Sequence, residues 1–195
     1  MLKHVYSYLF SPTTFFSDIF VIMNTDHVQF FTATILEWKH LLKQDKYKDI
    51  IVDSLSFLVK EHRVRIYGFV IMPNHIHLIW LINENHQRSD VQRDFLKYTA
   101  QNIKFDLIKN HPQVLEKFEV NAKDRKYQIW ERNPLSIDLY SREVLIQKLN
   151  YIHNNPLQGK WKLCELPETY KYSSALFYHS NIQNWSFLSH YTEGM

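Results

Sequence analysis

The stretch GFVIMPNHIHLIW, residues 68–80, holds two histidines, His75 and His77, that are separated only by Ile76. β-Branched and aromatic residues dominate the stretch, which favours a strand over a helix. Alternate residues of a strand point to the same face of a sheet, so both imidazoles project together while Ile76 points into a core. Two imidazoles that converge from a rigid strand supply two-thirds of a divalent-metal site. Without a metal, the alternative is a hydrogen-bonded histidine pair within a sheet.

Strands and helices alternate on either side of this stretch. Period-two or period-3.6 patterns predict strands at residues 28–36, 64–72, 75–82, 127–132 and 136–140, and helices at residues 47–61, 87–109 and 141–153, with a short helical piece near residues 114–120. Pro73 and Asn74 interrupt the two central strands, which predicts a tight hairpin. The order β-α-β-β-α-β-(β)-α predicts an α+β fold: a ferredoxin-like sandwich with one antiparallel sheet and helices packed on one face.

Residues 1–22 are apolar, but Pro12 and Asp18 interrupt the apolar run. The uninterrupted part is too short to span a bilayer, and neither a compact apolar region nor a small-residue cleavage site of a signal peptide is clear. We therefore expect residues 1–22 to be an N-terminal extension, either peripheral or upstream of a true start at Met23. Residues 23–195 are expected to form a single domain whose tail, from Gln158 onward, is irregular. No membrane partner is expected.

Composition excludes some classes of function. Only three glycines are present, so a glycine-rich phosphate loop is ruled out by counting. The single cysteine, Cys164, cannot form an internal disulfide and fits a reducing cytoplasm. A net charge of +3 is compatible with a polyanionic partner. The middle of the chain is loosely basic, and it is either a solvated face or a surface that contacts phosphates: Lys97, Lys104, Lys109, Lys117, Lys123, Arg125 and Lys126.

A second informative stretch is LNYIHNNPLQGKW, residues 149–161. On a helix, Tyr151 and Asn155 lie at positions i and i+4 and share one face. A phenol is a potential nucleophile, and an amide oxygen is a hard ligand suited to Mg²⁺ or Mn²⁺. Taken alone, Tyr151 is more often a half-buried packing residue, and Asn155 before Pro156 is an ordinary helix end. His153 lies about 200° around the helix from Tyr151 and is expected to be exposed.

Together these stretches resemble a known family. MPNHIHLIW, then YQIWER at residues 127–132, then YIHNNPLQGKW and the trailing YKYSSA at residues 170–175, are similar to the REP-associated tyrosine transposases. These belong to the HUH superfamily of single-strand DNA transposases, which carry a single catalytic tyrosine and also include an insertion-sequence branch. The resemblance covers residues 28–175. His-x-His alone is a weak signal, whereas the same pair after Met-Pro-Asn and before a distant Tyr-x-x-x-Asn-Pro is a strong one.

The resemblance implies a role for each matching residue. His75, His77 and Asn155 would bind a divalent metal, Mg²⁺ or Mn²⁺, and Asn154 is the adjacent candidate for the third ligand. Tyr151 would be the nucleophile that cleaves and rejoins DNA through a 5′-phosphotyrosine intermediate. The implied partner is single-stranded DNA or a hairpin with a neighbouring single-stranded tetranucleotide, and the implied protein is a monomer or a homodimer. The alternatives are a domesticated, non-catalytic DNA-binding relative and a metal-dependent phosphodiesterase that uses water.

Overall fold

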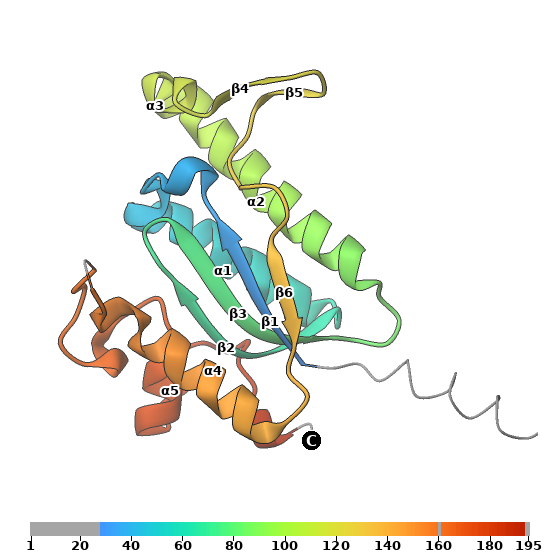
Figure 1. Ribbon diagram of the computed structural model, residues 1–195, viewed down its shortest axis with the longest axis vertical. Helices are drawn as coiled ribbons and strands as arrows, with labels where there is room; N and C mark the ends of the chain where they lie inside the picture. The colour runs from blue at the N-terminus through green and yellow to red at the C-terminus, as the bar shows by residue number, and fades with distance from the viewer. Residues whose placement is uncertain (1–27, 160, 194–195) are drawn as a thin grey trace, which may run out of the picture.

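The computed structural model describes residues 28–159 and 161–193. The predicted extension at residues 1–22 and the candidate start Met23 lie outside the described residues. One sheet organises the fold: β1 (Gln29–Thr34), β2 (Val64–Ile71), β3 (His75–Ile82) and β6 (Leu135–Asp138) pair in the order β2-β3-β1-β6, and every pair is antiparallel (Figure 1). The predicted α+β fold with an antiparallel, ferredoxin-like sheet is confirmed.

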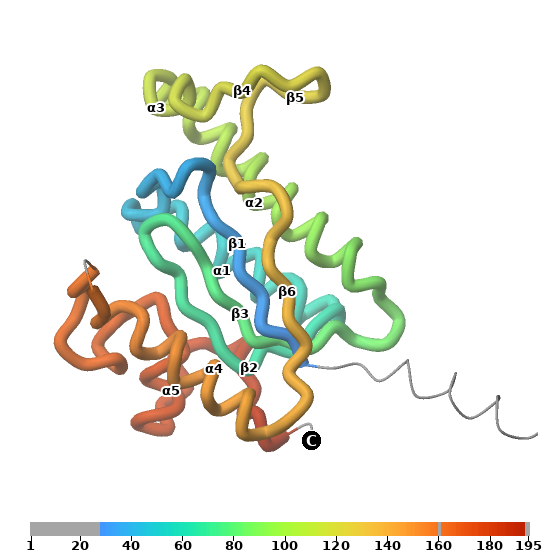
Figure 2. The backbone as a smooth tube through the Cα atoms, viewed as in Figure 1, coloured from blue at the N-terminus to red at the C-terminus, as the bar shows by residue number. Residues whose placement is uncertain are grey.

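Helices cover both faces of this sheet. α1 (Asp45–Lys60) and α2 (Arg88–Asn110) form the expected layer on one face, and α4 (Arg142–Asn154) packs on the other (Figures 1 and 2). The structure therefore adds a third layer to the predicted sandwich. The remaining elements are short: α3 (Pro112–Glu116), β4 (Glu119–Ala122), β5 (Arg125–Tyr127), α5 (Ala175–Ser180) and the 3₁₀ turns η2 (Leu36–Trp38), η3 (Leu41–Lys43), η4 (Asn155–Leu157), η5 (Pro167–Thr169) and η6 (Tyr191–Glu193).

The period-two alternation of the central strands separates two cores. Phe31 and Trp80 pack with residues of α1 and α2 in the larger core. Phe30 and Ile79 pack with Leu149 of α4 in the smaller one. Because Ile76 belongs to the larger core, the flanking His75 and His77 face α4, as the alternation predicts. The turn between β2 and β3 is the predicted tight hairpin, closed by a bond from Met72 N to His75 O at 2.8 Å.

Gly68 allows α4 to lie close to the sheet. The glycine sits where the pairing register of β2 with β3 shifts. A Cβ atom at this position would meet Leu149 Cδ1 at 2.6 Å and Ile152 Cδ1 at 3.1 Å, both on α4. These distances are shorter than ordinary van der Waals contact, so with a side chain here Leu149, Ile152 or the helix that carries them would have to shift.

His153 is buried, and the prediction that it is exposed is wrong. Only 2% of the residue is accessible, and its Nε2 atom hydrogen-bonds with Ser174 Oγ at 2.8 Å. Ser174 Oγ also accepts from the backbone N–H of Phe69 in β2 at 3.0 Å. Burial lowers the pKa of His153 to about 3, with a smaller contribution from His179. The angle between Tyr151 and His153 around the helix did not predict exposure, because α4 is covered on two sides, by the sheet and by the C-terminal segment.

Two local predictions need correction. Of the strand expected at residues 127–132, only Tyr127 is in a strand: it is the last residue of β5, which pairs with β4 in a separate hairpin. The chain beyond it follows the end of β1 without forming a strand: Leu36 N donates to Ile129 O at 2.8 Å and Glu131 N donates to Thr34 O at 2.7 Å. The helical piece expected near residues 114–120 is confined to α3 and is followed by β4.

The C-terminal segment covers the outer edge of β2. Ile71 N donates to Tyr172 O and Ser189 N donates to Ile66 O, both at 2.9 Å. The tail predicted to be irregular therefore contains α5 and supplies partners to the sheet edge. Although α2 has 23 residues, no helix within residues 28–159 and 161–193 combines the length and apolar character that crossing a membrane requires.

Candidate active site between the sheet and helix α4

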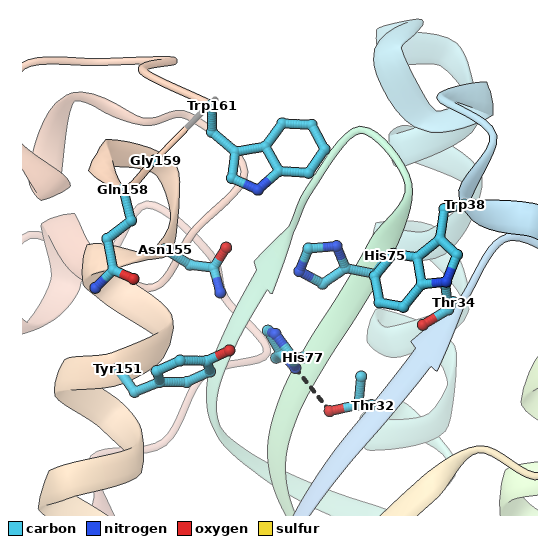
Figure 3. Close-up of a pocket in the computed structure, with 10 residues that line it drawn as sticks. All are labelled: Thr32, Thr34, Trp38, His75, His77, Tyr151, Asn155, Gln158, Gly159 and Trp161. Atoms are coloured by element: carbon cyan, nitrogen blue, oxygen red, sulfur yellow. Dashed lines mark hydrogen bonds between the residues drawn. The ribbon is translucent and has the colours of Figure 1, made fainter.

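A pocket of about 390 Å³ opens between the sheet and the C-terminal end of α4 (Figure 3). It brings together the four residues that the sequence singles out, His75, His77, Tyr151 and Asn155. Six further residues complete its lining: Thr32, Thr34, Trp38, Gln158, Gly159 and Trp161. Strands β1 and β3 form its floor, and α4 with η4 and the following loop forms one wall.

The surroundings of His77 leave one ring nitrogen that could hold a metal. Its Nδ1 atom hydrogen-bonds with Thr32 Oγ1 at 2.7 Å, directly across the β1–β3 pairing, while its buried Nε2 atom has no hydrogen-bond partner among the described residues. Burial lowers the pKa of His77 to about 3, helped by His75 and Lys148. The imidazole is therefore neutral at physiological pH. A histidine must be neutral to bind a metal, and a buried nitrogen without a partner is costly unless something binds it.

The tautomer of His75 follows from its neighbour Asn74. The Asn74 Nδ2 group donates to Trp38 O at 3.1 Å, so the amide oxygen faces the imidazole, and Nδ1 of His75 lies 2.7 Å from that oxygen. Nδ1 must then carry the proton, which leaves the lone pair of His75 on Nε2. Asn74 is fully buried, and the two histidine rings lie 4.7 Å apart.

Helix α4 supplies the phenol of Tyr151, and Asn155, the first residue of η4, supplies the amide. The Tyr151 ring lies 5.4 Å from the His77 ring, its hydroxyl points toward that histidine, and 43% of the residue is exposed (Figure 3). Asn155 is 6% exposed and its amide points into the pocket toward the histidines. An N-cap holds the other end of the helix, where Ser141 Oγ accepts from Val144 N. Lys148 adds a positive charge, 5.8 Å from the centre of the Tyr151 ring.

The two candidate asparagines differ in their surroundings. Asn155 lines the pocket, whereas Asn154 is exposed and donates to the carbonyl of Asn150 at 2.8 Å. Within the described part of the chain, no three His, Cys, Asp or Glu side chains gather in a metal-binding group. A cation here would therefore depend on the two imidazoles and the Asn155 amide oxygen. This donor set, with each histidine oriented through Nδ1, fits a divalent cation.

Sequence reasoning missed the residues that orient the two histidines. Thr32 lies in a different strand from His77, and only the pairing register places it opposite. Asn74 was visible as part of the hairpin break, but nothing in the sequence assigned its amide to His75. Trp38 at the pocket rim was missed, and Trp161, although it ends the second informative stretch, was given no role.

The fold is similar to that of a solved transposase. A REP-associated tyrosine transposase, solved bound to a REP hairpin, matches over 90% of this chain and 84% of that chain, at 17% sequence identity and a TM-score of 0.56. The chain has the fold of a REP-associated tyrosine transposase. The predicted resemblance to the REP-associated transposases is thus confirmed at the level of the fold.

The other comparisons add less. A candidate transposase from Deinococcus radiodurans matches over 78% of this chain and 97% of that chain, at 14% identity and a TM-score of 0.43, which is too low to carry an argument. No protein-family model matches the sequence, and no curated protein does. The REP-associated transposase fold therefore rests on three-dimensional likeness and on the short motifs.

Proposed function

We propose that this protein is a metal-dependent DNA transposase or endonuclease that cleaves and rejoins single-stranded DNA through Tyr151. The observation that carries the proposal is the pairing of two groups in one pocket. A buried, neutral His77 presents an unpartnered Nε2, and the hydroxyl of Tyr151 points toward it. An imidazole prepared for a metal beside a half-exposed phenol fits nucleophilic catalysis on a phosphodiester.

The proposed reaction is a transesterification. The Tyr151 oxygen attacks the phosphorus of a phosphodiester and gives up its proton, and the bond from phosphorus to the 3′ oxygen breaks. The leaving oxygen takes up a proton, so the products are a 5′-phosphotyrosine and a free 3′-hydroxyl. Because the phosphodiester bond energy is kept, attack by another 3′-hydroxyl rejoins the strands and releases Tyr151.

His75, His77 and Asn155 are the proposed metal ligands. A divalent cation bound to them supplies a Lewis acid that polarises the phosphate and stabilises its developing charge. Asn74 keeps His75 in the ligating tautomer, and the bond from Thr32 to Nδ1 of His77 holds that ring so that Nε2 is the nitrogen left for a metal. Lys148 places a second positive charge beside the Tyr151 ring, where an anionic substrate would lie.

DNA is the proposed partner, and a hairpin with adjoining single strand is the proposed form. The similar transposase of known structure is bound to a REP hairpin. Here, a groove of about 750 Å³ separates α2 from the β4–β5 hairpin and the segment that follows it. Its cationic lining residues, Arg93, Lys97, Lys104, Arg125 and Arg132, suit a phosphate backbone, although Asp124 and Glu131 also line it.

The proposal is tested by incubating the protein with single-stranded DNA from the flanks of its own gene and Mn²⁺, followed by a denaturing gel. Wild-type protein should give a covalent protein–DNA adduct that the Tyr151→Phe variant cannot form. Cleavage at the wild-type rate by Tyr151→Phe would indicate water as the nucleophile. Absence of cleavage by the wild-type protein would instead favour a non-catalytic DNA-binding protein.

Alanine variants of Asn155 and Asn154 test which asparagine is the third metal ligand, one serving as the control for the other. Asn155→Ala should abolish Mn²⁺-dependent cleavage, whereas Asn154→Ala should leave it close to wild type, because the Asn154 amide bonds outside the pocket. The reverse result would assign the third ligand to Asn154.

A further inference from the structure

Trp38 is an exposed indole at the rim of the candidate active site. It lines the pocket and is 62% exposed, and its ring lies 6.2 Å from the His75 ring. Other aromatic residues with a role in packing, such as Trp80 and Phe95, are buried in the core. An exposed tryptophan that packs so little of its surface does not serve the core, and its place at the site calls for another role.

The backbone that carries Trp38 is strained. Glu37 has φ 53° and Trp38 has φ 56°, so two successive non-glycine residues adopt the left-handed conformation. L side chains rarely occupy this region, and such residues persist where the surroundings hold them, commonly at functional sites. A tryptophan at the surface has no local reason to be held in this way.

Hydrogen bonds from three directions fix the turn. Trp38 N donates to Ile35 O at 2.9 Å, and the N–H of Glu37 donates to Glu131 Oε1 at 2.6 Å. The Trp38 carbonyl accepts from Asn74, the same buried residue that orients His75. One residue thus links the position of the indole to the tautomer of the proposed metal ligand.

A second indole stands at another side of the same rim. The Trp161 ring lies 6.1 Å from the His75 ring and 5.4 Å from the His40 ring. Figure 3 shows Trp38 and Trp161 on different sides of His75, with the pocket open between them. Both indoles can therefore be reached by a ligand whose phosphate lies at the histidines.

We propose that Trp38, with Trp161 as a second wall, stacks on unpaired bases next to the scissile phosphate. The proposal rests on the proposed function, and it names the feature by which the site would select single strands. Bases in a duplex already stack on their neighbours, whereas an unpaired base offers its face to an aromatic ring. Such stacking tolerates any base, because every base has a π-face.

The test compares two ligands of equal charge, labelled oligothymidylate and an abasic oligonucleotide with the same number of phosphates. Binding is followed by fluorescence anisotropy in EDTA, so that no cleavage takes place. Wild-type protein should bind oligothymidylate about ten-fold more tightly than the abasic strand. Trp38→Ala should lose most of this preference while its affinity for the abasic strand stays unchanged, and Trp38→Phe should keep part of it.

Phe57→Ala provides the matched control, because Phe57 is an exposed aromatic residue, 53% accessible, on α1 at the opposite face of the sheet. This variant should keep the full preference for oligothymidylate. Misfolding of Trp38→Ala would weaken binding of both strands alike and would be visible by circular dichroism, in which case Trp38→Phe and Trp161→Ala decide the question.

The proposal is overturned if the wild-type protein does not prefer oligothymidylate, or if the tryptophan variants keep the preference. Because no cleavage occurs in this assay, the result is independent of the Tyr151 chemistry. A normal adduct on Tyr151 without any preference for oligothymidylate would contradict the stacking role and leave the proposed chemistry standing. A preference for oligothymidylate without any adduct would contradict the proposed chemistry and leave the stacking role standing.

Discussion

Thr32 decides which nitrogen of His77 is available, because its hydroxyl bonds to Nδ1 at 2.7 Å. With Nδ1 occupied, the buried Nε2 atom is the ring nitrogen that remains for a metal. Outer partners of this kind commonly contribute 10- to 100-fold to metal affinity. The side chain that prepares the proposed ligand thus comes from a neighbouring strand.

Thr32→Val removes the hydroxyl and keeps the shape of the side chain. We expect this variant to bind Mn²⁺ roughly 10- to 100-fold more weakly in titration calorimetry, because the His77 ring loses the hydrogen bond that orients it. Thr32→Ser keeps a hydroxyl and should stay close to wild type. Equal affinities for wild type and Thr32→Val would show that Thr32 does not prepare the ligand.

His153 should make the fold sensitive to acid. In the unfolded chain its pKa is near 6.5, whereas burial lowers it to about 3 in the folded protein. As pH falls below about 6.5, the unfolded state takes up a proton that folded His153 does not accept, so the free energy of unfolding decreases until the pH approaches 3. Buried His77 acts in the same direction.

We therefore expect His153→Gln to lose less stability than wild type when the pH is lowered. Between about pH 7 and pH 4, the free energy of unfolding of wild type should fall by on the order of 3 kcal/mol more than that of His153→Gln, as measured by urea unfolding. His62→Asn, a change at an exposed histidine, should follow the wild-type curve. Parallel curves for wild type and His153→Gln would contradict the assignment.

At the scale of elements, the central question is how α4 reaches the sheet. Leu149 and Ile152 of this helix occupy the space that a side chain at position 68 would need. The His153–Ser174 bond ties the same helix to the segment along β2. These contacts set the distance between Tyr151 on the helix and the histidines on β3.

Gly68→Ala should destabilise the protein by about 1–3 kcal/mol, because the added methyl group overpacks the helix–sheet contact. The same change should reduce adduct formation, since it moves α4 and with it Tyr151. Adding Leu149→Ala removes the atom that would lie 2.6 Å from the new methyl group. The double variant should therefore be less destabilised than the sum of the single changes, as urea unfolding would show. Strict additivity would mean that Gly68 does not set the helix distance.

Elements with a strong local period could be predicted, and contacts set by tertiary packing could not. The β2–β3 hairpin, α1, α2 and α4 follow from periodicity and from breaks such as Pro73 and Pro156. The strand prediction for residues 128–132 was wrong although Ile129 and Trp130 are buried, as they would be in a strand. The segment lies beside the end of β1 and makes isolated backbone hydrogen bonds there instead of a continuous ladder.

At the scale of the whole molecule, the candidate site joins parts that are distant in sequence. His75 and His77 come from β3, Thr32 from β1, Tyr151 and Asn155 from α4 and η4, and Trp38 from the turn after β1. His75 with His77, and Tyr151 with Asn155, could be identified from the sequence. The spacing within each pair places both side chains on one face of a strand or of a helix. Thr32 depends on strand register, and Trp38 depends on a left-handed turn, so neither carries a local signal.

The central claim is that Tyr151 becomes covalently joined to DNA in the pocket formed by β3 and α4. The most direct measurement is mass spectrometry of the adduct formed with single-stranded DNA and Mn²⁺, after digestion with nuclease and protease. We expect a nucleotide attached through its 5′ phosphate to the peptide that contains Tyr151. A nucleotide on any other residue, or products with free 5′ phosphates and no modified peptide, would contradict it.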